Sequence, residues 1–169
     1  MKRSFCFLLI LSLLIIPGCA KESPEETLSF YYCRKEFAYG TETGIIVPEQ
    51  RSLPGHEDDL EYLLHMYVEG PLDDSLVSPF PKGTLLQGFT YSDATLYVTL
   101  NEPFAQLDGI DHTIAAACIA YTGFDLTPAE KVVIKCNSQR YGNKSITLYR
   151  DSVLFRDDSI APDPTQPPQ

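Results

Sequence analysis

The stretch from Glu69 to Phe104, EGPLDDSLVSPFPKGTLLQGFTYSDATLYVTLNEPF, decides the fold. Gly70-Pro71 ends a preceding helix, because glycine accepts the backbone angles of a helix end and proline cannot continue the helix. Pro79-Phe80-Pro81 then holds an extended loop. Alternating apolar residues predict two strands, Thr84–Tyr91 and Thr95–Leu100, joined by a tight turn. No catalytic group is recognisable here, so the stretch indicates architecture rather than chemistry.

Further elements are predicted on both sides of this stretch. A first helix has apolar residues at helical spacing, namely Leu60, Leu63, Leu64 and Tyr67. A second helix is predicted over Asp111–Phe124 with Asp111 as N-cap, and strands over Leu28–Cys33, Lys131–Cys136 and, as an edge hairpin, Ser145–Phe155. This order predicts an α+β fold, a split βαβ-type sandwich (β-α-β-β-α-β) with two helices packed on one face of a mixed sheet.

The N-terminus has the features of a lipoprotein signal peptide. Lys2 and Arg3 precede the apolar run Phe5–Ile16, which is shorter than the roughly 20 residues of a membrane-spanning helix. Gly18-Cys19 after this run resembles a bacterial lipobox, which predicts cleavage after residue 18 and lipidation of Cys19. The expected location is therefore extracytoplasmic, with the protein anchored to the cell membrane by lipid. An ordinary secretory signal with a chance cysteine is the alternative.

The rest of the chain divides into three parts. Residues 19–26 are polar and predict a tether, and residues 27–159 have the size of a single domain. Residues 160–169 contain four prolines (162, 164, 167 and 168) and predict a disordered tail, because proline lacks the N–H that strands and helices need. The formal net charge of −10 argues against binding to nucleic acid, whose phosphates require Lys and Arg.

No cofactor, metal or catalytic residue is expected, and the chain does not look like an enzyme. Cys33, Cys118 and Cys136 lack metal-site spacing, and as an odd number they are either small buried side chains or one disulfide plus a free thiol. Asp108, Asp111 and His112 form the single compact acid–imidazole group. It could hold a metal weakly, but a loop followed by a helix cap is the preferred interpretation.

Two groups of residues are candidates for recognition. The first is the stiff loop Pro79, Phe80 and Pro81, in which Phe80 is either an exposed anchor for a partner or a lid on the domain's own core. The second consists of Tyr91 and Tyr97, which together with Tyr31 are expected to share one sheet face. That face is an interaction surface if it is exposed, and core if the C-terminal segment covers it.

These motifs resemble the GerMN domain of sporulation and spore germination lipoproteins. The helix with Leu60, Leu63, Leu64 and Gly70-Pro71 matches the family frame LLxxLLxGP. The loop Leu76–Thr84, LVSPFPKGT, matches L-x-S-P-I-P-x-G-T. Val98, Leu100, Asn101 and Phe104 stand in the frame V-x-L-S-x-x-F, with Asn in place of the usual Ser. The resemblance covers about residues 27–150.

The resemblance implies a fold like the ring-building domains of sporulation channel proteins, with no catalytic residues. The function it implies is a non-enzymatic, membrane-anchored envelope protein that mediates protein–protein assembly in sporulation or spore germination. Its partners are then envelope proteins or further copies of itself. The alternative is a module that binds cell-wall glycan or a small ligand, with tyrosines such as Tyr91 and Tyr97 stacking on sugar rings.

Overall fold

Two sheets and two main helices make up the computed structural model, which describes residues 27–36, 44–138, 140, 142 and 144–152. The predicted signal peptide, tether, Cys19 and proline-rich tail lie outside these residues. One sheet has the strand order β2-β1-β3 and the other β4-β5-β6-β7. The elements are β1 (Thr27–Arg34), β2 (Ile46–Ser52), α2 (Leu60–Glu69), β3 (Leu76–Val77), β4 (Leu86–Ser92), β5 (Thr95–Leu100), α3 (Glu102–Ala105), α4 (Gly109–Leu126), β6 (Lys131–Cys136) and β7 (Lys144–Tyr149).

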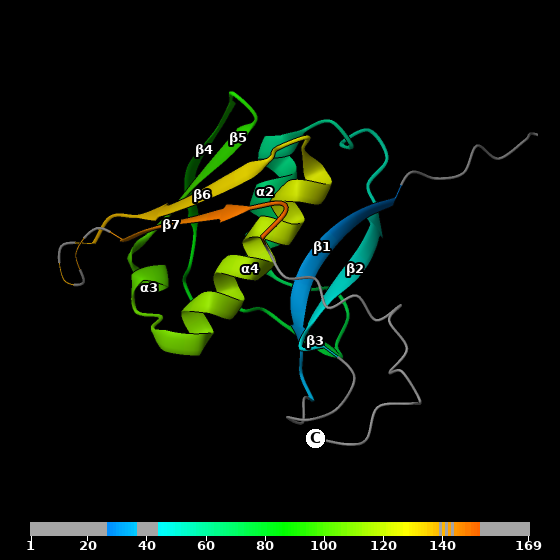
Figure 1. Ribbon diagram of the computed structural model, residues 1–169. Helices are drawn as coiled ribbons and strands as arrows, with labels where there is room; N and C mark the ends of the chain where they lie inside the picture. The colour runs from blue at the N-terminus through cyan, green and yellow to red at the C-terminus, as the bar shows by residue number, and fades with distance from the viewer. Residues whose placement is uncertain (1–26, 37–43, 139, 141, 143, 153–169) are drawn as a thin grey trace, which may run out of the picture.

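The larger sheet is mixed and carries α2 and α4 on one face, as Figure 1 shows. Strand β5 runs parallel to β6, while the β4–β5 and β6–β7 pairs are antiparallel. The parallel pair needs a crossover, and α3 and α4 supply it. The α+β class, with two helices on one face of a mixed sheet, is therefore confirmed.

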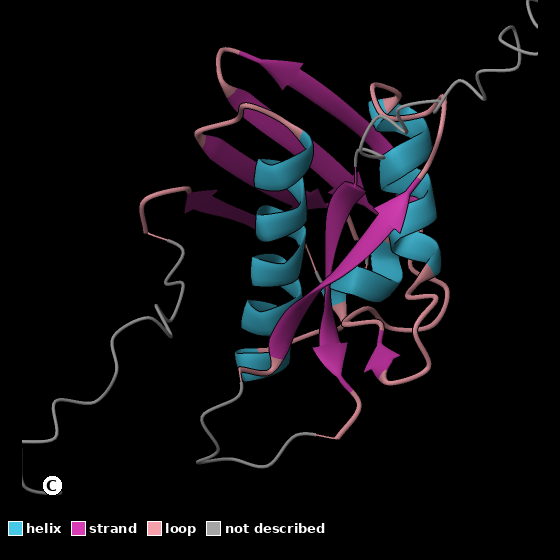
Figure 2. Cartoon of the chain, turned by 90° about the vertical axis from the view of Figure 1, so that its right-hand side faces the viewer, coloured by secondary structure: helices cyan, strands magenta, loops and turns pink. Residues whose placement is uncertain are grey.

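The smaller sheet was not foreseen as a separate layer. Strand β1 pairs antiparallel with both β2 and β3, and this sheet lies against the helices (Figure 2). Helix α4 therefore packs against β1 as well as against β6. Its side chains from Ala115 to Phe124 are buried with the exception of the half-buried Ala117. A helix between two sheets is apolar on nearly all sides, which explains why α4 lacks a clear polar face.

Each of the two main helices begins directly after an aspartate. Asp59 precedes α2 and its carboxylate accepts a hydrogen bond from Tyr62 N at 3.1 Å. Helix α4 begins at Gly109, so Asp108 occupies the N-cap position and Asp111 lies in the first turn. The prediction of Asp111 as N-cap is therefore wrong. Both aspartates suit a cap, and sequence alone does not tell which one precedes the first turn.

The β4–β5 hairpin turns at Asp93 and Ala94, which lie between the two paired strands. Both residues have positive φ, 49° and 53°, as in a type I′ turn. At positive φ the Cβ of alanine crowds the backbone, which costs about 1 kcal/mol. Glycine has no Cβ and adopts the same conformation without this cost.

The variant Ala94→Gly is therefore expected to be more stable than the natural protein by about 1 kcal/mol, measured by urea unfolding. Ala117→Gly, inside α4, is the matched control and is expected to lose about 1 kcal/mol. A loss of stability in Ala94→Gly would show that the turn does not hold this conformation in solution.

Candidate interaction surface

The mixed sheet has one face in the core and one turned away from it. Leu96, Val98 and Leu100 on β5 are buried at 0–2% exposure, and Leu96 faces Gly123 on α4. Side chains alternate along a strand, so the residues between them point outward. The same alternation on β6 directs Val132 and Ile134 inward and Lys131 and Lys135 outward.

We call the outward side chains of this sheet the outer face. Strand register assigns to it residues with hydroxyl groups, lysines, two tyrosines, Gly88 and the buried Val133. The exposed or half-buried members are Thr90, Ser92, Tyr97, Thr99, Lys131, Lys135, Ser145, Thr147 and Tyr149.

The charge of the outer face is opposite to that of the chain. The strands β4–β7 contain no Asp or Glu, whereas the whole chain has a formal net charge of −10. Acidic residues gather elsewhere, for example at Glu57–Asp59 before α2 and at Asp73-Asp74 after it. Lys135 Nζ lies 4.9 Å from the centroid of the Tyr97 ring, a cation–π contact between the neighbouring strands β6 and β5. The outer face is thus a locally cationic surface.

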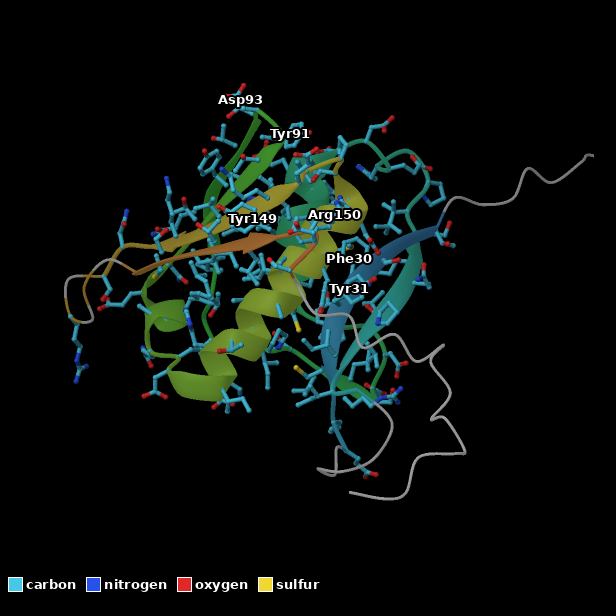
Figure 3. The ribbon with its side chains drawn as sticks, in the orientation of Figure 1. Phe30, Tyr31, Tyr91, Asp93, Tyr149 and Arg150 are labelled. Atoms are coloured by element: carbon cyan, nitrogen blue, oxygen red, sulfur yellow. The ribbon has the colours of Figure 1, made fainter. Side chains whose placement is uncertain are left out.

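The three predicted tyrosines do not share one face. Tyr97 belongs to the outer face, but Tyr91 pairs with Leu96 and so lies on the opposite side of the sheet, at the hairpin end, where it is 41% exposed. Tyr31 belongs to the other sheet (Figure 3). The expectation failed because alternation gives the faces of one strand, but not the register or the sheet to which the strand belongs.

Tyr31 joins β1 to α4. Its hydroxyl donates to Asp125 Oδ2 at 2.9 Å, its ring lies 5.3 Å from that of Tyr121, and its backbone N–H donates to Thr122 Oγ1. Burial and the neighbouring Asp125 raise the pKa of Tyr31. This tyrosine therefore contributes to packing between the layers.

Phe80 takes the role of a lid on the core. It is 9% exposed, and its ring packs edge-on against Tyr67 at 5.4 Å and lies 6.5 Å from Phe104. Pro79 and Pro81 flank it at the surface and are half-buried. The loop therefore directs its aromatic ring inward, and Phe80 is not placed as an exposed anchor.

A buried ion pair fixes the start of this loop, and no pattern in the sequence predicts it. Arg51 on β2 pairs with Glu49 and donates through Nη2 to Gly70 O at 2.8 Å. Glu49 Oε1 accepts the backbone N–H groups of Leu72 and Asp73 at 2.8 and 2.6 Å. The pair thereby connects β2 to the end of α2 and to the chain that leaves it.

Tyrosine hydroxyls complete this buried network. Tyr32 OH accepts from Arg51 Nη2 at 3.1 Å and lies 3.0 Å from Tyr67 O, and Tyr67 OH donates to Tyr31 O at 3.0 Å. Burial is the main cause that raises the pKa of both Tyr32 and Tyr67 above the ordinary value.

Stability is therefore expected to fall as pH rises above about 10, the ordinary pKa of tyrosine. Above that pH the unfolded chain releases protons that folded Tyr31, Tyr32 and Tyr67 retain, and this favours unfolding. Urea midpoints at pH 9 and pH 11 measure the effect. Tyr67→Phe is expected to show a smaller fall, and equal falls in both proteins would contradict the assignment.

Arg150 closes the end of α4 beside a shallow groove. Its guanidinium donates to the carbonyl oxygens of Phe124, Thr127 and Ala129 at 2.7–3.1 Å, where a helix end attracts positive charge (Figure 3). The groove is open and has a volume of about 660 Å³. Its lining residues are Phe124, Asp125, Leu126, Thr127, Pro128, Glu130 and Arg150. The three hydrogen bonds of its guanidinium give Arg150 a structural role at the end of α4.

The acid–imidazole group of Asp108, Asp111 and His112 lies at the start of α4. Asp108 precedes α4, and the ring of His112 lies 5.6 Å from that of Phe104. Within the described ranges no three His, Cys, Asp or Glu side chains are placed to hold a metal ion.

Comparison with known proteins agrees with this architecture. A family profile described as "Germane: Sporulation and spore germination" matches residues 29–142, more than half of the chain. The chain belongs to the Germane family. Its relation to sporulation and spore germination proteins, and the resemblance to the GerMN domain, are thereby confirmed. No curated protein matches the Germane chain in sequence.

Solved structures support the fold of this Germane domain. The first GerMN domain of the sporulation protein GerM from Bacillus subtilis matches with a TM-score of 0.51 and 17% identity, over 75% of this chain and 98% of that one. The tandem GerMN domains of the same protein match with a TM-score of 0.50 and 17% identity, over 69% of this chain and 40% of that one. At this identity the likeness concerns the fold.

Among the described residues, no helix is both long and apolar enough to cross a bilayer.

Proposed function

We propose that this Germane domain is a non-enzymatic envelope protein, anchored to the outer side of the cell membrane through Cys19, that assembles with a protein partner in sporulation or spore germination. Family membership supports the biological setting. The observation that carries the assembly role is the outer face, a surface with lysines and hydroxyl groups and no carboxylate, on an acidic chain.

The partner is expected to present acidic groups to this surface. Complementary charge steers two proteins together and suppresses wrong partners. Tyr97 and Tyr149 add aromatic area of the kind enriched in interfaces, and Tyr149 is 52% exposed. An envelope protein or a second copy of this acidic chain fits these requirements.

Site-specific photocrosslinking in living cells tests the proposal. A photoreactive residue at Thr147, on the outer face in the middle of the edge strand β7, is compared with one at Tyr62 on α2, which is 40% exposed but lies outside that face. A discrete crosslinked protein is expected from position 147 in starved, sporulating cells and not from position 62. Charge reversal by Lys131→Glu with Lys135→Glu is expected to abolish the product.

Two results would contradict the assembly role. Equal crosslinking from both positions, unaffected by charge reversal, would mean that the outer face is not the contact surface. Retention of the purified domain on peptidoglycan, lost in Tyr97→Ala, would instead support the glycan-binding alternative.

The anchor has a separate test. Cys19→Ala is expected to move most of the protein from the membrane fraction to the soluble or secreted fraction, because the acyl chains supply the membrane affinity. Cys33→Ala is the control and is expected to remain with the membrane. Membrane retention of Cys19→Ala would exclude lipidation at this residue as the anchor.

A further inference from the structure

Two buried thiols from different layers of the domain lie next to each other. Cys33 on β1 is 7% exposed and Cys118 on α4 is fully buried, and both are unoxidised in this structure. Cys136 lies on β6 and donates through Sγ to Asn101 O at 3.0 Å. The question left open by the sequence, which of the three cysteines are neighbours, is thus decided by the way β1 crosses α4.

The contacts of Tyr31 fix that crossing. Its N–H donates to Thr122 Oγ1 at 2.9 Å, and β1 runs from there toward the N-terminal end of α4 (Figure 1). Cys33 lies two strand residues further on, about 6.6 Å. Cys118 lies four helical residues before Thr122, about 6 Å. Equal steps in the same direction place the two side chains next to each other between β1 and α4.

We propose that Cys33 and Cys118 form a disulfide bond when the protein meets a disulfide oxidant outside the cytoplasm, and that Cys136 remains a thiol. The extracytoplasmic setting rests on the function proposed above, whereas the choice of pair rests on geometry alone. Disulfides persist in compartments that are oxidising and are rare in the cytosol.

The reaction is a thiol–disulfide exchange. The Cys33 thiolate attacks one sulfur of an external disulfide R–S–S–R, forms a mixed disulfide and releases one RS⁻. Cys118 then gives up its proton, attacks the Cys33 sulfur and releases the second RS⁻. The two cysteines lose two electrons in total and R–S–S–R gains them, while the two thiol protons go to the two released thiolates.

The order of the two steps follows from exposure. Cys33 is 7% exposed and Cys118 is fully buried, so an external disulfide reaches Cys33 first. The neighbouring Cys118 thiol also lowers the pKa of Cys33, whereas the Cys33 thiol and burial raise the pKa of Cys118. Cys33 is therefore the attacking group and Cys118 the resolving one.

The test uses the full chain carrying Cys6→Ser and Cys19→Ser, so that only the three domain cysteines remain. The folded protein is oxidised with excess oxidised glutathione, free thiols are alkylated, and peptides are identified by mass spectrometry. A peptide linked through Cys33 and Cys118, with Cys136 alkylated, is expected. The linked protein is expected to have a higher urea midpoint, which returns to the starting value on reduction.

Single variants make the assignment falsifiable. Cys136→Ser is expected to form the same link, and Cys33→Ser is expected to form none. A link to Cys136, glutathione adducts without a link, or three unreacted thiols would each overturn the proposal. These results concern purified protein, so they are independent of where the chain is located in the cell, which the Cys19→Ala fractionation measures.

Discussion

Replacing Arg51 by Met is expected to lower the free energy of unfolding by about 3–5 kcal/mol, since it leaves the buried carboxylate of Glu49 without its cation. Domains of this size are stable by only about 5–15 kcal/mol, so the variant is expected to be partly unfolded at growth temperature. Urea unfolding followed by circular dichroism measures the change.

A double variant separates the charge from the loss of packing. In Glu49→Gln with Arg51→Met, the amide oxygen of the glutamine can still accept the backbone N–H groups of Leu72 and Asp73. The unpaired negative charge is removed. The double variant is expected to recover part of the stability that Arg51→Met loses. If Arg51→Met lost less than about 1 kcal/mol, the pair would behave like an exposed salt bridge and would not fix the loop.

Replacing Gly123 by Val is expected to cost about 2–3 kcal/mol by overpacking the contact between α4 and the mixed sheet. A Cβ at Gly123 would lie 2.8 Å from Leu96 Cδ2 and 3.2 Å from Val132 Cγ2, and both neighbours are fully buried. Glycine is required there because the helix backbone approaches the sheet too closely for any side chain.

Gly88→Val is the matched control for Gly123→Val. It is the same change at a position on β4 where a Cβ would have no atom within 4 Å, and valine favours strands. Its thermal midpoint is expected to stay the same or to rise. Equal losses at both positions would point to a general cost of replacing glycine, and not to the α4 contact.

Local patterns in the sequence predicted most of the elements of the mixed sheet. Strands Thr95–Leu100 and Lys131–Cys136 have the predicted bounds, and the strict alternation of Thr95–Leu100 leaves one choice of buried face. Strand β1 was also recognised, but its sheet was not. Both Tyr31 and Tyr32 make contacts with helices, so neither side of β1 is polar enough to indicate which element it pairs with.

The candidate surface could be found only in part from sequence. The absence of Asp and Glu from four strands of an acidic chain is visible in the sequence, but the register is needed to place Tyr97 and Lys135 on one face. Burial of Glu49 and Arg51 could not be foreseen, because charged residues two apart on a strand are usually exposed. Tertiary packing alone turns them into a buried network.

The central position of β1 has a mechanical consequence. Thr27 begins a strand that is hydrogen-bonded along one edge to β2 and near its end to β3, and whose two sides contact α2 and α4. A tensile load entering at Thr27 therefore acts on the middle strand of a sheet, where bonds on both edges and two packed interfaces must shear together. An edge strand would instead peel away one bond at a time. The domain is built so that a pull from its N-terminal side is spread over both helices.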